Sequence, residues 1–243
     1  MSWIKAVGIG PGDPAHMTGQ AANALREGDA VVGYNTYLNL IKPIIQDKEV
    51  FGSGMRQEIL RCKKALELAQ AGKKVCVISS GDPGIYGMAG LLLELCVKED
   101  IDIDIEVIPG VSAVNAAASL LGAPLMHDFA MISLSDHLTP WQVIEKRLDL
   151  SAQADFVIAL YNPKSRERKH HLERALEIIS QHKSSGTPVG IVKNALRAGE
   201  RVIVSTLASV AKEDIDMTSI VIIGNRHTFA WKNRIITPRG YEL

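Results

Sequence analysis

Short apolar runs alternate with longer amphipathic segments through the first half of the chain, and this alternation predicts an α/β fold. The run Lys74–Ile78 is short and apolar after its first residue, as in a parallel strand buried on both faces. The segment Glu58–Ala71 shows helical periodicity through Ile59, Cys62, Leu66 and Ala69, and Gly72 is a natural stop. We expect strands at Ile4–Ile9, Asp29–Tyr34, Lys74–Ile78 and Asp104–Ile108, and helices at about Thr18–Glu27, Glu58–Ala71, Gly90–Val97 and Ala116–Leu121.

The loop Ser79–Gly87 stands between a predicted strand and a predicted crossover helix. Gly81, Gly84 and Gly87 would let a ligand approach the main chain, and Asp82 would supply one fixed acceptor. The helix start behind the loop would offer unpaired N–H groups. The alternative interpretation is a tight strand-to-helix connection that binds no ligand.

Two further predicted strands also end in glycine-bearing turns, Gly8–Pro14 and Pro109–Ala113. Such turns share one edge of a parallel sheet, so their coincidence predicts a ligand site better than any single loop does. The first turn half-matches the dinucleotide fingerprint, but Asp13 occupies the third glycine position and would repel a pyrophosphate. Ser112 is a plausible helix cap whose hydroxyl could instead face a ligand. No P-loop lysine motif and no H-E-x-x-H is present.

The second half of the chain, after Gly122-Ala123-Pro124, predicts another α/β domain with a mixed sheet. Short links between its last strands indicate antiparallel pairs. We place the boundary between Ser112 and Pro124, which gives an N-terminal domain at 1–115 and a C-terminal domain at 116–243. Strands are expected at Ala130–Leu134, Asp155–Leu160, Val189–Lys193, Arg201–Thr206 and Ser219–Ile223, and helices at about Trp141–Leu148 and Arg166–Gln181.

Composition limits the classes of partner. The 243 residues carry 27 Lys plus Arg and 27 Asp plus Glu, so no global field attracts nucleic acid or an anionic membrane. No signal-like start is visible and no apolar run approaches the ~20 residues of a spanning helix, which predicts a cytoplasmic protein. Cys62, Cys76 and Cys96 lie apart in apolar-periodic segments and are expected to be buried, reduced thiols. We expect no metal site.

Several motifs in register resemble known proteins along essentially the whole chain. Three of them, Gly8-x-Gly10-Pro11-Gly12-Asp13, Gly81-Asp82-Pro83-x-x-Tyr86-Gly87 and Pro109-Gly110-x-Ser112-Ala113, resemble the S-adenosylmethionine-dependent tetrapyrrole methyltransferases. Within that family the chain is similar to the precorrin-3B or cobalt-factor III C-17 methyltransferase branch, through Leu121-Gly122-Ala123-Pro124-Leu125-x-His127-Asp128-Phe129, Ile132-Ser133-Leu134-Ser135-Asp136, Leu138-Thr139-Pro140-Trp141 and Tyr161-Asn162-Pro163.

The resemblance implies two α/β domains with the active-site cleft between them, a homodimer, and S-adenosyl-L-methionine bound in that cleft. It implies methylation of C-17 of a precorrin-3-type tetrapyrrole with ring contraction, giving precorrin-4 or cobalt-precorrin-4 in cobalamin biosynthesis. A methyltransferase for another corrin precursor and a non-catalytic binding protein remain alternatives. Whether the ring carries cobalt stays open.

The resemblance also implies which residues contact the cofactor. Asp82 is interpreted as a loop-shaping or ligand-orienting acceptor without a proton-transfer role, and the contact at Leu160 or Tyr161 is uncertain by one place. The implied cofactor residues are Pro11, Gly81, Asp82, Ile85, Tyr86, Ser112 and Ala113, followed by Leu160, Tyr161, Asn162, Asn194, Ala195, Thr218 and Ser219.

A tetrapyrrole with many carboxylates requires local positive charge. Lys164, Arg166, Arg168, Lys169, His170 and His171 are expected at the start of a helix, where the dipole disfavours cations and a docked carboxylate would relieve the conflict. The alternative is an exposed helix face on which Glu167 and Glu173 pair with these cations. The substrate candidates are Arg56, Ser133, Ser135, Asp136, Lys164, Arg166 and Arg168.

Ring contraction requires proton movement, and His127 beside Asp128 is the candidate catalytic pair. A histidine titrates in the useful range, and an adjacent carboxylate can orient it. The alternative is a structural histidine that only makes hydrogen bonds.

Overall fold

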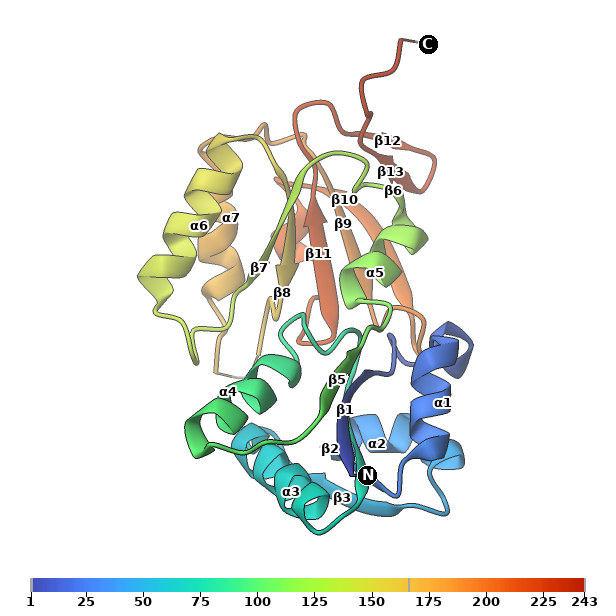
Figure 1. The fold of residues 1–243 in the computed structure, drawn as a ribbon. Helices are drawn as coiled ribbons and strands as arrows, with labels where there is room; N and C mark the ends of the chain where they lie inside the picture. The colour runs from blue at the N-terminus through green and yellow to red at the C-terminus, as the bar shows by residue number, and fades with distance from the viewer. Residues whose placement is uncertain (1, 166, 243) are drawn as a thin grey trace. The chain divides into compact units, whose positions relative to one another are not determined.

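The computed structural model describes residues 2–165 and 167–242, and the chain divides into two compact units, Met1–Ala113 and Val114–Leu243. Each unit has its own five-stranded sheet, and the second also has a small sheet in the order β12-β13-β6 (Figure 1). Each unit also has its own buried hydrophobic clusters. The predicted fold class, a parallel-rich sheet followed by a mixed sheet, is confirmed. In the described part of the chain, no helix is both long and apolar enough to span a bilayer.

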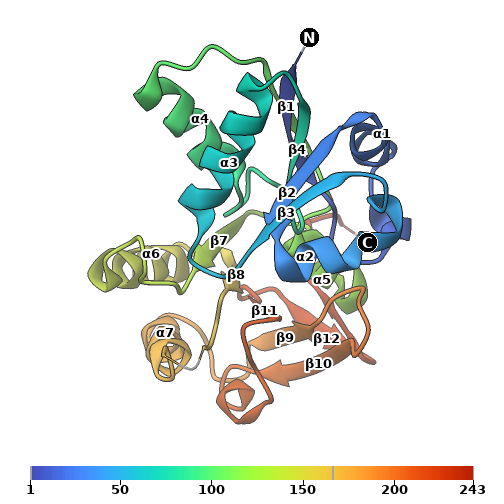
Figure 2. The same cartoon turned by 90° about the horizontal axis from the view of Figure 1, so that it is seen from below.

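The first unit contains a five-stranded, wholly parallel sheet in the order β3-β2-β4-β1-β5. Its central strand β4 is buried from Val75 to Ser79, as expected for a strand covered on both faces. Helices α3 and α4 cover one face and α1 and α2 cover the other (Figure 2). The elements are β1 Trp3–Gly8, η1 Pro14–His16, α1 Gly19–Glu27, β2 Ala30–Tyr34, α2 Asn35–Leu40, η2 Lys42–Ile44, β3 Glu49–Ser53, α3 Glu58–Gln70, β4 Lys74–Ser79, α4 Ala89–Glu99 and β5 Ile105–Ile108.

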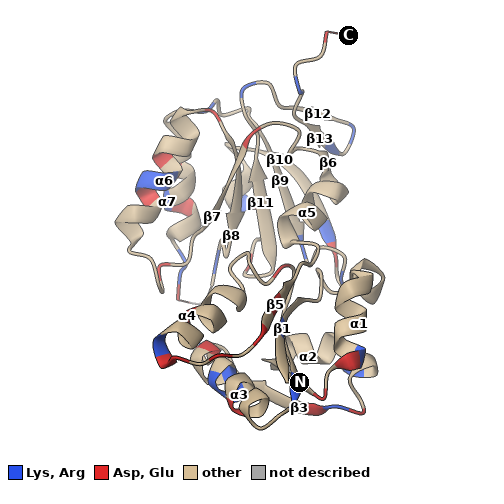
Figure 3. Ribbon diagram, viewed as in Figure 1, with Lys and Arg blue, Asp and Glu red and all other residues tan. Residues whose placement is uncertain are grey.

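Helix α3 buries Cys62, Leu66 and Ala69 as predicted. The exception is Ile59, which is 57% exposed. The buried stripe also contains Arg61, whose Nη1 donates to Ser53 Oγ at the end of β3 over 2.8 Å. Exposed helices such as α3 carry Lys and Arg mixed with Asp and Glu (Figure 3).

The second unit contains a five-stranded mixed sheet in the order β10-β9-β11-β8-β7. Strands β7 and β8 are parallel, and β11 runs antiparallel to both β8 and β9, which confirms the expected antiparallel pairs. The elements are α5 Ala113–Leu121, β6 Gly122–Ala123, β7 Phe129–Ser133, α6 Trp141–Gln153, β8 Val157–Tyr161, α7 His171–Ser180, β9 Pro188–Lys193, β10 Arg201–Thr206, η3 Val210–Lys212, β11 Ser219–Ile223, β12 Phe229–Trp231 and β13 Arg234–Ile236.

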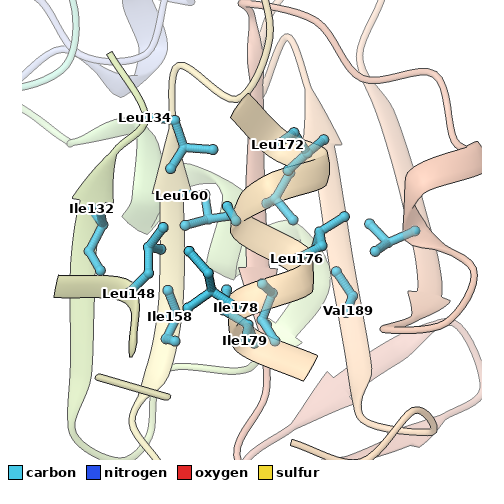
Figure 4. Packing of buried hydrophobic residues seen from close by; sticks show 14 of the residues in the cluster. Ile132, Leu134, Leu148, Ile158, Leu160, Leu172, Leu176, Ile178, Ile179 and Val189 are labelled. Carbon is cyan, nitrogen blue, oxygen red and sulfur yellow. The ribbon is translucent and has the colours of Figure 1, made fainter. Parts of the chain in front are cut away.

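Helices α6 and α7 cover one face of this sheet. Figure 4 shows Leu172, Leu176 and Ile179 of α7 among the strand side chains Ile158 and Leu160. On β9, a Cβ at position 190 would come within 2.4 Å of a methyl carbon of Leu121, the last residue of α5. Gly190 therefore allows α5 to pack closely against the sheet.

Two predictions about this unit are wrong. The helix expected at Arg166–Gln181 begins only at His171, so Lys164, Arg168 and Lys169 lie in an irregular segment and the helix-dipole argument does not apply to them. Arg166 itself lies outside the described residues. Helix α6 continues to Gln153, past the expected end at Leu148.

The cysteines agree in part with their prediction. Cys62 and Cys76 are buried free thiols, while Cys96 is half-buried. Burial raises the pKa of Cys62 and Cys76 to about 12 each, so both stay protonated and unreactive at neutral pH.

Candidate functional site

In the first unit, the turns after β1, β4 and β5 meet at the carboxyl edge of the sheet. Gly10 and Gly81 form a two-way backbone bridge: Gly10 N donates to Gly81 O over 3.2 Å, and Gly81 N donates to Gly10 O over 2.7 Å. Ile9 N donates to Ser79 O over 3.0 Å. The prediction that these turns share one edge is confirmed.

Glycine is required where these turns touch one another. A Cβ on Gly110 would lie 2.1 Å from Gly81 O and 2.8 Å from Gly8 O. A Cβ on Gly87 would lie 2.6 Å from Pro83 O. The glycines at 8, 87 and 110 therefore allow main-chain segments to touch one another. We expected Gly87 to leave room for a ligand, and it does not.

Asp82 holds the loops in shape, which is the first of the two roles predicted for it. Its Oδ1 accepts from Gly84 N over 2.8 Å, and its Oδ2 accepts from Gly110 N over 3.0 Å. The sequence predicted unpaired N–H groups at the start of α4, but two of these amides already have acceptors. Met88 N donates to Ser79 Oγ over 3.1 Å, and Ala89 N donates to Pro83 O over 3.0 Å.

Tyr86 is an exposed aromatic residue at this edge. Its side chain is 57% exposed, and its backbone has a φ of 53°. A bulky residue in the left-handed region is strained, and such strain is common in functional loops.

The other predicted cofactor residues of this edge are less exposed. Ile85 is half-buried, and Pro11 and Ser112 are buried. Ser112 directly precedes α5.

Asp13 has a structural role in the first turn. It caps the short helix η1, accepting from Ala15 N over 2.8 Å. The turns Ile9–Asp13, Ser80–Gly87 and Pro109–Ala113 contain no Lys or Arg. This edge therefore suits a neutral nucleoside better than a polyphosphate.

In the second unit, the predicted cofactor residues also gather at one sheet edge. Strands β7, β8 and β9 end there, and β11 begins there. Asn162 Nδ2 donates to Ser133 Oγ over 3.0 Å, and Asn194 N donates to Thr218 O over 3.1 Å. Residues far apart in the sequence, from the ends of four strands, are thus brought together.

The backbone of this edge is also unusual. Asn162 and Asn194 have φ values of 52° and 51°, and Leu196 has a φ of 56°. Asparagine tolerates this left-handed conformation better than most residues. The two asparagines therefore fit sharp chain reversals directly after β8 and β9.

Leu160 and Tyr161 differ in their surroundings. The Leu160 side chain is fully buried in the core of the second unit, so only its main chain can meet a ligand. The Tyr161 hydroxyl accepts from Val114 N, at the start of α5, over 3.0 Å.

Sequence reasoning missed Lys193 and Asp216, which hold the loop at Thr218. Asp216 Oδ1 accepts from the Thr218 amide over 2.8 Å and from its hydroxyl over 2.7 Å. Lys193 Nζ lies 2.7 Å from Asp216 Oδ2. Burial alone would raise the pKa of Asp216, but these bonds outweigh burial and hold its pKa below the usual value.

The substrate candidates are dispersed. Arg56 follows β3 in the first unit with a φ of 60°, and Ser133 accepts two hydrogen bonds, from Asn162 and from Ser135 N. Arg168 bonds Ser165 through its amide, while its side-chain Nε is buried with no acceptor among the described residues. Of the expected acidic partners, Glu173 pairs with His170 over 3.0 Å.

Asp136 pairs with a histidine of the basic segment. Its Oδ2 lies 3.1 Å from His171 Nε2, and the His171 ring meets Trp141 edge-on with 4.4 Å between centroids. Asp136 is therefore already paired with another side chain, and its negative charge makes it a poor contact for a carboxylate.

The structure separates His127 and Asp128 from the candidate site at the ends of β7 and β8. They precede β7, whereas Ser133 ends it, and the strand between them spans roughly 13 Å. His127 Nδ1 accepts from Asp128 N over 2.9 Å and lies 3.8 Å from Asp128 Oδ2. His127 lines a shallow pocket with Ala154 and His227 at the other end of the sheet. This placement favours the structural alternative.

Among the described residues, no group of three or more His, Cys, Asp or Glu side chains could hold a metal ion.

Comparisons with known proteins bear on this arrangement. The family described as "Tetrapyrrole (Corrin/Porphyrin) Methylases" matches residues 4–211. The chain is 55% identical to a Salmonella typhimurium protein named "Probable cobalt-factor III C(17)-methyltransferase", over 99% of this chain and 100% of that protein. It is 47% identical to the Priestia megaterium "Cobalt-factor III methyltransferase", over 98% of this chain but 45% of that longer protein.

A solved structure described as "Crystal structure of the methyltransferase CobJ" has the same fold. Its TM-score is 0.93 at 36% identity, with 98% of this chain and 100% of the other covered. The family match covers well over half of the chain, and relatives at high identity cover nearly all of it. The chain therefore belongs to the tetrapyrrole (corrin/porphyrin) methylases.

Proposed function

We propose that this chain transfers a methyl group from S-adenosyl-L-methionine to C-17 of a precorrin-3-type tetrapyrrole, with coupled ring contraction, in cobalamin biosynthesis. The observation that carries the proposal is the 55% identity, over the full length of both chains, to the Salmonella typhimurium protein. The names of both relatives contain cobalt-factor III, which favours the cobalt-bearing ring as substrate and cobalt-precorrin-4 as product.

The loops of the first unit fit the cofactor. S-adenosylmethionine supplies an electrophilic methyl group on a sulfonium, together with a neutral adenosine and a zwitterionic amino-acid tail. The turns after β1, β4 and β5 present main chain without Lys or Arg, and the turn after β4 carries the exposed Tyr86. We assign Pro11, Gly81, Asp82, Ile85, Tyr86, Ser112 and Ala113 to cofactor binding. Asp82 acts there by fixing the loops.

The carboxyl edge of the second sheet supplies the other proposed cofactor contacts. The left-handed residues Asn162 and Asn194 expose main chain directly after two strands, and the Asp216 bonds fix the loop at Thr218. Leu160 would contribute through its main chain only. The residues assigned are Leu160, Tyr161, Asn162, Asn194, Ala195, Thr218 and Ser219.

Methyl transfer to carbon needs alignment and exclusion of water more than it needs an acid or a base. Holding both reactants in place can lower the barrier by roughly 7 kcal/mol or more. Main-chain groups on strand ends suit this task because the sheet fixes their positions. The strained residues Tyr86, Asn162 and Asn194 are consistent with such a fixed site.

Arg168 is the proposed carboxylate contact in the second unit. A buried guanidinium N–H without an acceptor costs on the order of 1–3 kcal/mol, and a substrate carboxylate would remove that cost. Lys164 and Arg56 are the other proposed cationic contacts. Ser133 and Ser135 remain proposed polar contacts.

Isotope transfer tests this function. Cofactor labelled in its methyl group is incubated separately with the cobalt-bearing and the metal-free ring, and the products are identified by mass spectrometry. Label on C-17 of a contracted ring is expected with the cobalt-bearing substrate. Label on another corrin precursor supports the second candidate, a different substrate in the same family. Binding of both ligands without transfer supports a binding protein.

The proposed assembly is a homodimer. Light scattering of the purified chain tests it, and a monomer mass would reject it.

A further inference from the structure

His171 is held on two sides. Its Nε2 lies 3.1 Å from Asp136 Oδ2, and its ring packs edge-on against Trp141. The side chain is 20% exposed, so the ring is partly shielded but still reachable. A carboxylate at this distance from Nε2 restrains the orientation of the imidazole.

The second ring nitrogen of His171 is available. Nδ1 has no hydrogen-bond partner among the described residues, whereas Nδ1 of His127 already accepts from Asp128 N. An imidazole with one nitrogen on a carboxylate and the other open is the arrangement used to accept or return a proton.

The pair lies next to the candidate cofactor edge of its own unit. Asp136 follows Ser133 by three residues, and Ser133 is bonded to Asn162. Three residues of chain span at most about 11 Å. Asp136 therefore lies within that distance of the strand end at Ser133, on the side where β7 and β8 terminate.

Charged side chains lie on the elements packed around His171. Asp136 faces it from the segment before α6, and Arg168 lies near Asp136. On α6 and α7 the neighbouring charges are paired with each other: His170 with Glu173, and Arg174 with Glu145. Burial would raise the pKa of Asp136, but the bond to His171 and the nearby cations lower it overall, so Asp136 stays ionised at neutral pH.

We propose that His171, oriented by Asp136, is the proton-transfer residue of this site. This inference rests on the proposed function, because ring contraction is the step that requires a proton to leave the macrocycle. In that step a C–H or N–H bond of the macrocycle breaks, its electron pair stays on the macrocycle, and the proton forms a new bond to Nδ1. The proton transfer itself changes no oxidation state, and the Asp136 carboxylate stabilises the resulting imidazolium.

The chain contains a matched control pair. His182 Nε2 lies 2.7 Å from Asp149 Oδ1, with side chains 25% and 47% exposed, against 20% and 41% for His171 and Asp136. His171 begins α7, whereas His182 lies just beyond its end. The two pairs have the same residue types and similar burial but differ in position, and of the two only His182 meets its carboxylate in hydrogen-bonding geometry.

The test compares His171→Gln with His182→Gln in the full chain. Glutamine can still donate to Asp136 but cannot act as a base. Formation of contracted product should fall at least about 100-fold in His171→Gln and stay within about twofold of wild type in His182→Gln. Calorimetry with S-adenosylhomocysteine should give a dissociation constant within about threefold of wild type for both variants.

The pH profile separates proton transfer from a structural role. If His171 acts as a base, the wild-type rate should rise with pH through an imidazole pKa. Asp136→Asn removes the negative charge that stabilises the imidazolium, so this rise should move to lower pH. An unmoved profile, or near-wild-type turnover in His171→Gln, overturns the inference. If wild-type protein transfers no methyl group, the proposed function itself fails.

Discussion

The amide of Gly110 donates to Asp82 Oδ2 over 3.0 Å, which joins the turn after β5 to the turn after β4. The second oxygen of Asp82 accepts from Gly84 within its own loop. One carboxylate therefore fixes the shape of two of the three turns at this edge.

Asp82→Ala should loosen both turns. We expect the free energy of unfolding to fall by about 2 kcal/mol, since hydrogen bonds to a charged group are lost from a part-buried site. Affinity for S-adenosylhomocysteine should fall at least about tenfold. Urea unfolding and calorimetry measure the two effects, and Asp100→Asn, an exposed left-handed position that tolerates asparagine, is the control. Unchanged affinity with lowered stability would show that these turns do not hold the cofactor.

A pair of glycine substitutions tests the contact between turns. In Gly110→Ala the new Cβ would lie 2.1 Å from a backbone oxygen, so the turns must separate and unfolding should become easier by about 3 kcal/mol or more. In Gly90→Ala, within α4, the new Cβ meets nothing within 4 Å, and stability should rise by about 0.5–1 kcal/mol. Thermal unfolding distinguishes the two. Equal effects would contradict the predicted close contact.

The first unit was largely predictable because buried parallel strands leave a clear sequence pattern. Strands β1, β2, β4 and β5 are short apolar runs, and parallel topology places their ends at one edge. Strand β3 was not predicted: it is an edge strand of five residues in which Glu49, Val50 and Gly52 are exposed. Such a strand lacks the apolar run by which a buried strand is recognised in a sequence.

The site in the second unit was predictable only in part. His127 was a catalytic candidate and Ser133 a substrate candidate, but β7 separates them because an extended strand advances about 3.3 Å per residue. His171 and Asp136 lie 35 positions apart, and they meet because the start of α7 lies beside the start of α6. No pattern of neighbouring residues in the sequence predicts that contact.

Tyr161→Phe tests whether its hydroxyl has a structural role. Loss of the hydroxyl leaves the Val114 amide, an N–H in the first turn of α5, without this acceptor. Stability should fall by about 1–2 kcal/mol, while affinity for S-adenosylhomocysteine stays within about threefold because the ring remains. Tyr241→Phe, on an exposed residue, should change stability by less than about 0.5 kcal/mol. Unchanged stability with a large loss of affinity would place the hydroxyl on the cofactor.

A buried ion pair stabilises the opposite end of the second sheet. Lys183 Nζ, on a side chain only 1% exposed, lies 3.2 Å from Asp155 Oδ1, and Arg226 Nε lies 2.8 Å from Asp155 Oδ2. Burial lowers the pKa of Lys183, and Asp155 offsets this effect only in part. Burial opposes ionisation of Asp155 as well, but the two cations together outweigh it and hold its pKa below the usual value.

The pair predicts a specific acid sensitivity. Because the pKa of Asp155 is lower in the folded than in the unfolded protein, its contribution is present above the ordinary aspartate pKa near 3.9 and is lost as pH falls below it. Asp155→Asn should cost about 3 kcal/mol at pH 7, since Lys183 is left buried without a counter-charge. Urea unfolding from pH 6 to pH 2.5 should show a flatter decline for this variant than for wild type. Arg226→Gln, with a 70% exposed side chain, should cost less than about 1 kcal/mol. Parallel acid declines for wild type and Asp155→Asn would show that this carboxylate is not a source of the acid sensitivity.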